Sequence, residues 1–396
     1  MNLRFYIARR LSYKGRVVTA AVAVSFMVVI IAVAVSSGFR HEIRRGLSEM
    51  TADVMLSPSA MNYLDESSPL DTDQSYLPAV AAVDGVVSVE PVIARAGIVN
   101  HSDDIYGVLV KGVEGGPQAK GVEVPDSVSL AVSVPVTLAQ TAGLKQGDKL
   151  LIYFVGDNVK VRQFYVAGFY EPLLRTDDKY LVYADISDMR RLNGWSDDQA
   201  SMFEISLSPD RRDEDSMRAA VERISDAMYF NAAEDDDILW TTSSMERYPQ
   251  IFDWLNIIEF NVIFVLVLMI AVAGVNMITG LLIMLFENIS TIGLLKSLGM
   301  RNLEIVNVFL TRASGTVFKG MLIGNLAAFI MCFVQSRTHL LSLDPVNYFV
   351  SYVPVHLDIA TVLTADLVAF VSIMVLLVLP SLFVLKVDPS KTIKMD

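Results

Sequence analysis

The feature that most constrains this chain is a run of 27 consecutive uncharged residues from Phe260 to Phe286, without an internal proline. A helix needs about 20 apolar residues to cross the hydrocarbon core of a bilayer. The run therefore predicts a membrane span. Composition agrees, because 53% of the 396 residues are hydrophobic and 19% are charged, whereas soluble domains are about 45–50% apolar and about 25% charged.

Three further stretches predict spans. Residues 17–39 are 23 uncharged residues, and residues 367–385 are 19. Only 17 residues separate Lys319 from Arg337, but the apolar pattern begins near Ile305, and long basic side chains close to a helix end can reach the membrane surface. A cleaved signal peptide is the alternative for the first stretch. Its length and the spans that follow favour an uncleaved anchor, so four spans are predicted.

Charge is distributed unevenly along the chain. Residues 1–39 contain five bases and no acid, whereas residues 40–259 contain 37 acids and 19 bases, a net charge of −18. Short basic segments beside spans remain in the cytoplasm, and Lys386, Lys391 and Lys394 follow the last span. We therefore expect both termini in the cytoplasm and the acidic block outside it. The lack of a basic face argues against nucleic-acid binding.

The predicted fold class is an α-helical membrane protein with four transmembrane helices and a large mixed α/β extracytoplasmic domain between helices 1 and 2. The expected segments are a cytoplasmic basic amphipathic segment (1–16), helix 1 (17–39), the α/β domain with helical stalks (40–255), helix 2 (256–286), a cytoplasmic loop (287–304), helix 3 (305–336), a short outer loop (337–359), helix 4 (360–385) and a cytoplasmic tail (386–396).

Periodicity within the acidic block predicts its secondary structure. Alternation predicts strands over residues 86–99 and 105–113, and two more strands joined across Gly156–Asp157–Asn158, with a short helix at Val136–Ala142. Arg40–Met50 and Met245–Phe260 are expected to continue the first two spans as helices. Together they would form a two-helix stalk.

Motifs for enzymatic chemistry are missing from the sequence. It contains no GxxxxGK[S/T] loop to hold nucleotide phosphates, and no nucleophile elbow or HExxH helix. The four histidines lie far apart, and the single cysteine, Cys332, cannot form an intrachain disulfide. We expect no catalytic site, bound cofactor or metal in this chain.

The loop between the second and third spans is the most informative segment. Ser290 or Asn288 can cap a helix there, and Gly299 can end it. The apolar residues of one stripe are Ile289, Ile292, Leu295 and Leu298. A short amphipathic helix of this kind fits a groove on a partner protein, or it rests on lipid headgroups. The pattern alone leaves these two alternatives open.

This loop resembles that of a known family. Its IGLLKSLGM core is similar to the EIGILKALG loop of FtsX-like ABC permeases. The segments FYIARRL, LAQTAGLKQGDKL, YVAGFYEPLLRTDDKYLVYADISDMRRL and DPSKTIK resemble the lipoprotein-releasing (LolC/LolE-type) branch, in the same order over nearly the whole chain. Two positions depart from the pattern. Thr291 stands where the family has an acid, leaving Glu287 as the acidic residue of the loop, and the VGDNVKVRQ turn is shorter than the proline-bearing hook that binds the lipoprotein carrier.

The resemblance implies a permease subunit that extracts lipoproteins from the bacterial inner membrane for transfer to the outer membrane by mechanotransmission. In that mechanism, nucleotide-driven closure of the ATPase would pass through the helix over residues 288–299 and shift the stalks. The outer domain of the permease would be a MacB-like periplasmic core with two subdomains. ATP and Mg²⁺ would be used by a separate ABC ATPase, present in two copies, and a second permease, identical or paralogous, would complete the assembly. A periplasmic lipoprotein carrier is a further expected partner. The implied ATPase-coupling residues are Glu287, Ile289, Ile292, Leu295, Leu298 and Gly299.

Large apolar side chains near the outer ends of the first two spans are candidates for an acyl-chain cavity: Val35, Ile258, Phe260, Ile263 and Phe264. Ordinary contact with membrane lipid explains any one of them equally well. One alternative function is an FtsX-type regulator of cell-wall hydrolases, although that branch has a much smaller outer domain. Another is a macrolide- or toxin-export permease, whose ATPase is usually fused or adjacent. A membrane-anchored scaffold would leave the loop helix unexplained.

Overall fold

The computed structural model of the chain describes residues 15–58, 69–101, 104–124, 129–156, 159–172 and 180–382. Nearly all of the predicted basic segment 1–16 and the whole tail 386–396 lie outside the described residues. The contacts divide the chain into two units. We call Met1–His41, Asp253–Ser342 and Tyr352–Asp396 the helical unit, and Glu42–Phe252 with Leu343–Ser351 the α/β unit.

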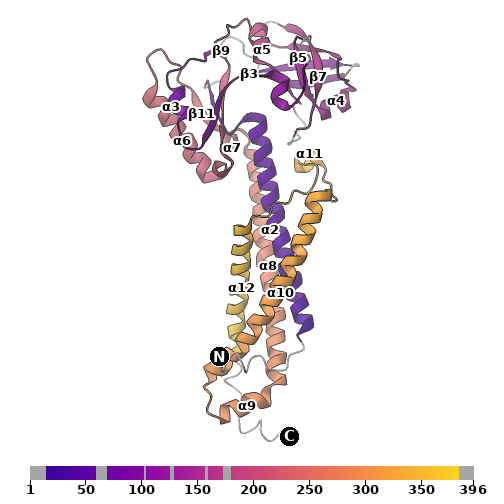
Figure 1. The fold of residues 1–396 in the computed structure, drawn as a ribbon, viewed down its shortest axis with the longest axis vertical. Coiled ribbons are helices and arrows are strands. Elements are labelled where there is room, and N and C mark those ends of the chain that lie inside the picture. Colours follow the sequence, from indigo (N-terminus) through magenta and orange to yellow (C-terminus); the bar gives the residue numbers. More distant parts are fainter. Residues whose placement is uncertain are drawn as a thin grey trace. The chain divides into compact units, whose positions relative to one another are not determined.

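Most of the helical unit consists of residues from four long helices (Figure 1). They are α2 (Arg16–Thr51), α8 (Pro249–Glu287), α10 (Asn302–Thr338) and α12 (Ile359–Ser381). Among the described residues, these helices are long and apolar enough to cross a membrane. The short helix α9 (Ile289–Ser297) connects α8 to α10.

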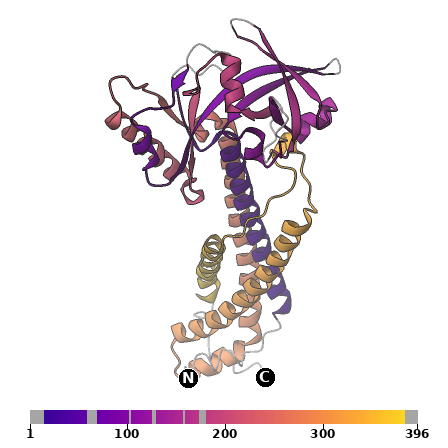
Figure 2. The same cartoon turned by 45° about the horizontal axis from the view of Figure 1, so that its top comes forward.

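Small residues allow α10 to approach α2 closely, and both views of the molecule show these two helices crossing (Figures 1 and 2). A Cβ atom on Gly320 would lie 2.7 Å from a methyl carbon of Val22, and one on Gly324 would lie 2.9 Å from Cβ of Phe26 and closer still to the carbonyl oxygen of Ala23. Glycines four residues apart are typical of tightly packed membrane helices, because they let backbones meet. This spacing fixes the position of α10 on α2.

The predicted helix over Met245–Phe260 is wrong as a single element. The structure has α7 (Ser244–Arg247), a non-helical Tyr248 with φ −128° and ψ 55°, and then α8, which starts at Pro249. The ring of a proline disfavours helical geometry at the preceding residue. Pro249 is itself tolerated at the start of α8, because the first amide groups of a helix have no partner within it.

The α/β unit is built on one large sheet with the strand order β11-β1-β10-β3-β4-β8-β5-β7-β6. Its strands are β1 (Val54–Ser57), β3 (Val86–His101), β4 (Asp104–Val113), β5 (Ala131–Pro135), β6 (Lys149–Phe154), β7 (Lys160–Tyr170), β8 (Tyr180–Asp185), β10 (Met202–Leu207) and β11 (Trp240–Ser243). A separate small sheet pairs β2 (Leu70–Asp71) with β9 (Gln199–Ala200). The remaining short elements are α3 (Leu77–Ala81), η1 (Gly116–Lys120), α4 (Val136–Ala142), α5 (Ile186–Asn193), η2 (Pro209–Arg211), α6 (Glu214–Asn231) and α11 (Pro345–Tyr348).

Strand β3 is shared by two parts of this sheet. Its first half pairs with β10, while its second half pairs with β4 on one side and with β6 on the other. The pairing with β6 closes six strands into a ring around a core that includes Val99, Ile152 and Phe164. A second core, under α3 and α6, includes Leu56 and Ile224. The strands predicted over residues 86–99 and 105–113 are confirmed, as is the helix at Val136–Ala142.

Candidate functional site

A groove of about 350 Å³ lies within the helical unit, between α2, α8 and α12. Ligand cavities are typically about 300–1,000 Å³. The lining residues are Val33, Ser36, Ser37, Arg40, Glu259, Val262, Ile263, Leu266, Thr361, Thr364, Ala365 and Val368. Some of these side chains are apolar, and the others carry a hydroxyl group or a charge. The lining is therefore suited to an amphiphile.

An ion pair joins two walls of the groove. Arg40 of α2 pairs with Glu259 of α8, and both side chains are partly exposed. Arg40 is the first charged residue after the first uncharged run, and Glu259 is the last before the second. The guanidinium of such a pair can contact an anionic headgroup, and the carboxylate can contact a cationic one. The apolar lining residues are Val33, Val262, Ile263, Leu266, Ala365 and Val368.

The segment before α12 holds the third wall in place. The amide of His356 donates to the carbonyl of Ala34 in α2 at 3.0 Å, and Gly38 of α2 lies against the backbone of Pro354, where a Cβ atom would collide. The imidazole rings of His41 and His356 stack with their centroids 4.6 Å apart. These contacts bring α12 beside the second half of α2.

Asp358 caps the first turn of α12. Its side chain accepts hydrogen bonds from the amides of Ala360 and Thr361, and from the Thr361 hydroxyl at 2.5 Å. The hydrogen bond from the Thr361 side chain is the main reason that the pKa of Asp358 lies below its usual range. Asp358 is thus a carboxylate at neutral pH, and it fixes Thr361 on the groove wall.

Only one of the five predicted acyl-chain residues lines this groove. Ile263 does so, whereas Val35, Ile258, Phe260 and Phe264 are not among its lining residues. The side chain of Phe264 is 63% exposed on the surface of the isolated chain. Sequence reasoning also missed Arg40 and Glu259, although their positions at the ends of two uncharged runs were a usable signal. The contribution of α12 had no such signal, because it depends on tertiary packing.

Helix α9 lies at the other end of α8 from the groove. From Ile263 to Glu287, α8 rises about 36 Å at about 1.5 Å per residue, which is close to the thickness of a bilayer. Asn288 occupies the position before α9, as predicted, but its side chain makes no capping bond. Its Nδ2 donates instead to the carbonyl of Met284 at 2.8 Å. Gly299, with φ +85°, follows the end of the helix.

The apolar stripe predicted on α9 points in two directions. Ile292 is 1% exposed, and Leu295 is partly buried, because both pack against the core of the helical unit. Ile292 is thus covered within the helical unit, whereas Leu295 keeps part of its surface exposed. Leu294 is 56% exposed and Leu298 is 75% exposed. Leu298 directly follows the last residue of α9 and lies four residues after Leu294, so the two form an exposed apolar pair at that end of the helix.

The remaining predicted coupling residues flank this exposed pair. Ile289 is partly buried, while Glu287 and Gly299 are exposed. No group of three or more His, Cys, Asp or Glu side chains within the described ranges could hold a metal ion. The two features that the geometry supports are therefore an amphiphilic groove and a short helix with an exposed apolar face.

Two family models match the chain. One, described as MacB-like periplasmic core domain, matches residues 17–227, and the other, described as FtsX-like permease C-terminal, matches residues 263–389. Together with the four apolar helices, they define a transporter permease subunit with a periplasmic α/β domain. The chain belongs to the FtsX-like permeases that carry a MacB-like periplasmic core domain, in their LolC/LolE-type branch. The predicted family is thereby confirmed.

Curated relatives match over the full chain. The lipoprotein-releasing system transmembrane protein LolC of Neisseria meningitidis serogroup B is 22% identical over 428 residues, covering 100% of this chain and 98% of the relative. The protein of the same name from Xylella fastidiosa is 20% identical over 424 residues, with the same coverage of 100% and 98%. The solved periplasmic region of MacB from Actinobacillus actinomycetemcomitans aligns with 52% of this chain and 94% of its own, at 12% identity and a TM-score of 0.32.

Proposed function

We propose that this chain is the permease of an ABC transporter that extracts lipoproteins from the inner membrane for transfer to the outer membrane. The groove between α2, α8 and α12 carries this proposal, because it offers an apolar path with a charged and hydroxylated end. A lipoprotein anchor has the same two parts, namely acyl chains and a polar ester and amide linkage. The names of the full-length relatives, which are lipoprotein-releasing system proteins, support this choice of substrate.

The proposed topology places both termini in the cytoplasm and residues 40–255 in the periplasm. The five bases and no acids of residues 1–39, against the net charge of −18 over residues 40–259, support this orientation. The groove would then lie toward the periplasmic leaflet and α9 at the cytoplasmic surface. The α/β unit would form the two predicted subdomains around its two larger cores.

Helix α9 is the proposed docking element for the ATPase. Leu294 and Leu298 would enter a groove on that partner, with Glu287 beside them, while Ile292 and Leu295 hold α9 on the helical unit. The partner would bind and hydrolyse ATP with Mg²⁺. Two ATPase copies and a second permease, identical or paralogous, complete the proposed assembly.

Photo-crosslinking tests the proposed substrate site. A crosslinking amino acid at Ile263, which lines the groove, should capture a tagged lipoprotein in inner-membrane vesicles. The same probe at Phe264 is the matched control, because this neighbour is exposed but does not line the groove. Preferential capture at Ile263 is expected. Equal capture at both positions, or preferential capture at Phe264, would contradict a specific site in the groove.

A further inference from the structure

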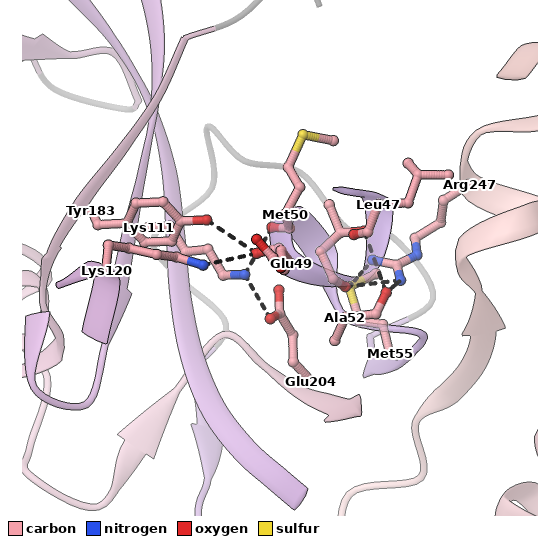
Figure 3. A network of polar contacts seen from close by, with 11 residues as sticks. Leu47, Glu49, Met50, Ala52, Met55, Lys111, Lys120, Tyr183, Glu204 and Arg247 are labelled. Carbon is pink, nitrogen blue, oxygen red and sulfur yellow. Dashed lines mark hydrogen bonds and ion pairs between the residues drawn. The ribbon is translucent and has the colours of Figure 1, made fainter. Parts of the chain in front are cut away.

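The carboxyl end of α2 is held by side chains from other elements of the α/β unit (Figure 3). The last carbonyl groups of a helix have no partner within it, and cations are favoured near them. The carbonyls of Glu49, Met50, Thr51 and Ala52 each accept a hydrogen bond from a side chain outside α2. We name the four donors, Lys111, Lys120, Tyr183 and Arg247, the α2 clamp.

Three members of the clamp come from one side of the helix end. Nζ of Lys120, the last residue of η1, donates to the carbonyl of Glu49 at 3.1 Å, and the Tyr183 hydroxyl donates to the same carbonyl at 3.3 Å. Nζ of Lys111 donates to the carbonyl of Met50 at 3.0 Å. Lys111 of β4 and Tyr183 of β8 are register partners in the sheet. The helix end is therefore attached to paired strands.

Arg247 of α7 completes the clamp. Its Nη2 donates to the carbonyls of Thr51 at 3.0 Å and Ala52 at 3.2 Å. Ala52 has φ +54°, in the left-handed region that a side chain disfavours, and the chain turns there from α2 into β1. Only Tyr248 separates Arg247 from the start of α8. One guanidinium thus holds the end of one long helix where the other begins.

Burial strengthens the contacts of Lys111. Nζ of Lys111 also pairs with Oε2 of Glu204 at 2.6 Å, and the two side chains are 6% and 13% exposed. The Lys120 ammonium lies 4.6 Å from the ring centroid of Tyr183. Burial, followed by repulsion from Lys111, lowers the pKa of Lys120, while Glu49 and Glu204 oppose that change. Charged hydrogen bonds away from water are stronger than those at an open surface.

We infer that Lys111, Lys120 and Arg247 are positioning residues for release of the substrate, because they fix the end of α2 to the sheet that the proposed movement of the stalks would drive. Apolar packing alone allows a helix to rotate or slide. Directional bonds to successive carbonyls from two sides restrict both movements. The inference rests on the proposed function, because it assigns the clamp a role in lipoprotein release.

The test uses the full chain with its ATPase in proteoliposomes. The double variant Lys111→Met/Glu204→Met removes one clamp donor without leaving a lone buried charge, and Lys120→Met removes a second donor. We expect lipoprotein released per ATP hydrolysed to fall at least tenfold when both changes are combined. The ATPase should still co-purify and ATP turnover should remain close to that of the parent, while the thermal unfolding midpoint falls modestly because the carbonyl of Met50 loses its Lys111 donor. Lys120→Arg should retain release.

Arg45→Met is the matched control, because Arg45 makes an exposed pair with Glu49 on the same part of α2 and is not in the clamp. This variant should release lipoprotein normally. Unchanged release per ATP in the combined clamp variant would overturn the inference. Loss of release together with loss of folding or of ATPase association would also overturn it, since the clamp would then be structural only.

A second measurement separates failure of the clamp from failure of the proposed function. Spin labels at Arg45→Cys in α2 and Lys145→Cys in the α/β unit, with Cys332→Ala, report their distance in the full chain with its ATPase. We expect one narrow distance distribution with and without ATP, and a broad one in the combined clamp variant. An equally narrow distribution in that variant would overturn the inference about the clamp, even if no lipoprotein were released. Absent release by the parent chain would contradict the proposed function instead.

Discussion

Arg40 of α2 forms an ion pair with Glu259 of α8, so the charges that border two separate uncharged runs meet between two walls of one groove. Partly exposed ion pairs contribute only about 0–1 kcal/mol to stability. The pair is therefore more important for what the groove can bind than for holding the helices together.

Reversing one charge of this pair should impair transport without unfolding the chain. Arg40→Glu places two carboxylates together at the polar end of the groove, and we expect release to fall about fivefold, equivalent to about 1 kcal/mol. Arg40→Glu/Glu259→Arg restores opposite charges and should recover most of the activity. Release from proteoliposomes measures both. A double variant no better than Arg40→Glu would contradict the role of the pair.

Leu298→Glu should weaken ATPase association. Placing its carboxylate in an apolar contact costs at least about 2 kcal/mol, or about 30-fold in affinity. Ser297→Glu is the control, because Ser297 is the exposed neighbour of Leu298 and lies outside the apolar pair. Leu295→Glu does not discriminate, because Leu295 packs against the helical unit itself. Co-purification with the ATPase is the measurement, and undiminished recovery with Leu298→Glu would contradict docking through α9.

Gly324→Val should destabilise the helical unit. The added Cβ would collide with the backbone of Ala23 and the side chain of Phe26, and overpacking typically costs about 1–3 kcal/mol. Gly315→Val is the matched control on the same helix, because nothing lies within 4 Å of a Cβ atom there. Thermal unfolding in detergent compares the two. Equal midpoints would contradict the close contact of α10 with α2.

Asp213 caps α6, and Asp213→Ala should cost about 1 kcal/mol at neutral pH. The hydrogen bond from the Ser216 side chain is the main cause that holds the pKa of Asp213 below its ordinary value of 3.8. The stability from its ionised form is therefore fully present above that value and is lost as the pH falls through the lower folded-state pKa. Asp213→Asn cannot ionise, so its difference from the parent in unfolding midpoint should shrink on acidification. A difference independent of pH would contradict this account.

Local sequence patterns predicted helices and strands. Tertiary contacts determined which of their side chains are buried and which groups they bond to. The helix at Val136–Ala142 and the strand over residues 86–99 could be read from periodicity. The inward direction of Ile292 could not, because α9 is apolar on more than one side and only the packed bundle shows which side is buried. Asn288 likewise has a side chain suitable for capping, but it bonds to Met284 instead.

The groove was predicted only in part for the same reason. Two of its walls come from α2 and α8, whose outer ends were expected to meet, but the third comes from α12, far along the chain. Its position depends on Gly38, which permits the close approach of Pro354, and on the hydrogen bond between His356 and Ala34. Neither contact leaves a periodic signal in a single sequence.

The most direct test of the central claim is ATP-dependent release of a lipoprotein from proteoliposomes that contain this chain, its ATPase and any second permease. We expect release of the acylated protein and none of the same protein without its lipid anchor. Val368→Trp, on the groove wall, should reduce release severalfold, whereas Leu367→Trp, an exposed neighbour outside the groove, should not. Release that is independent of ATP or of acylation, or an equal effect of the two tryptophans, would contradict the account.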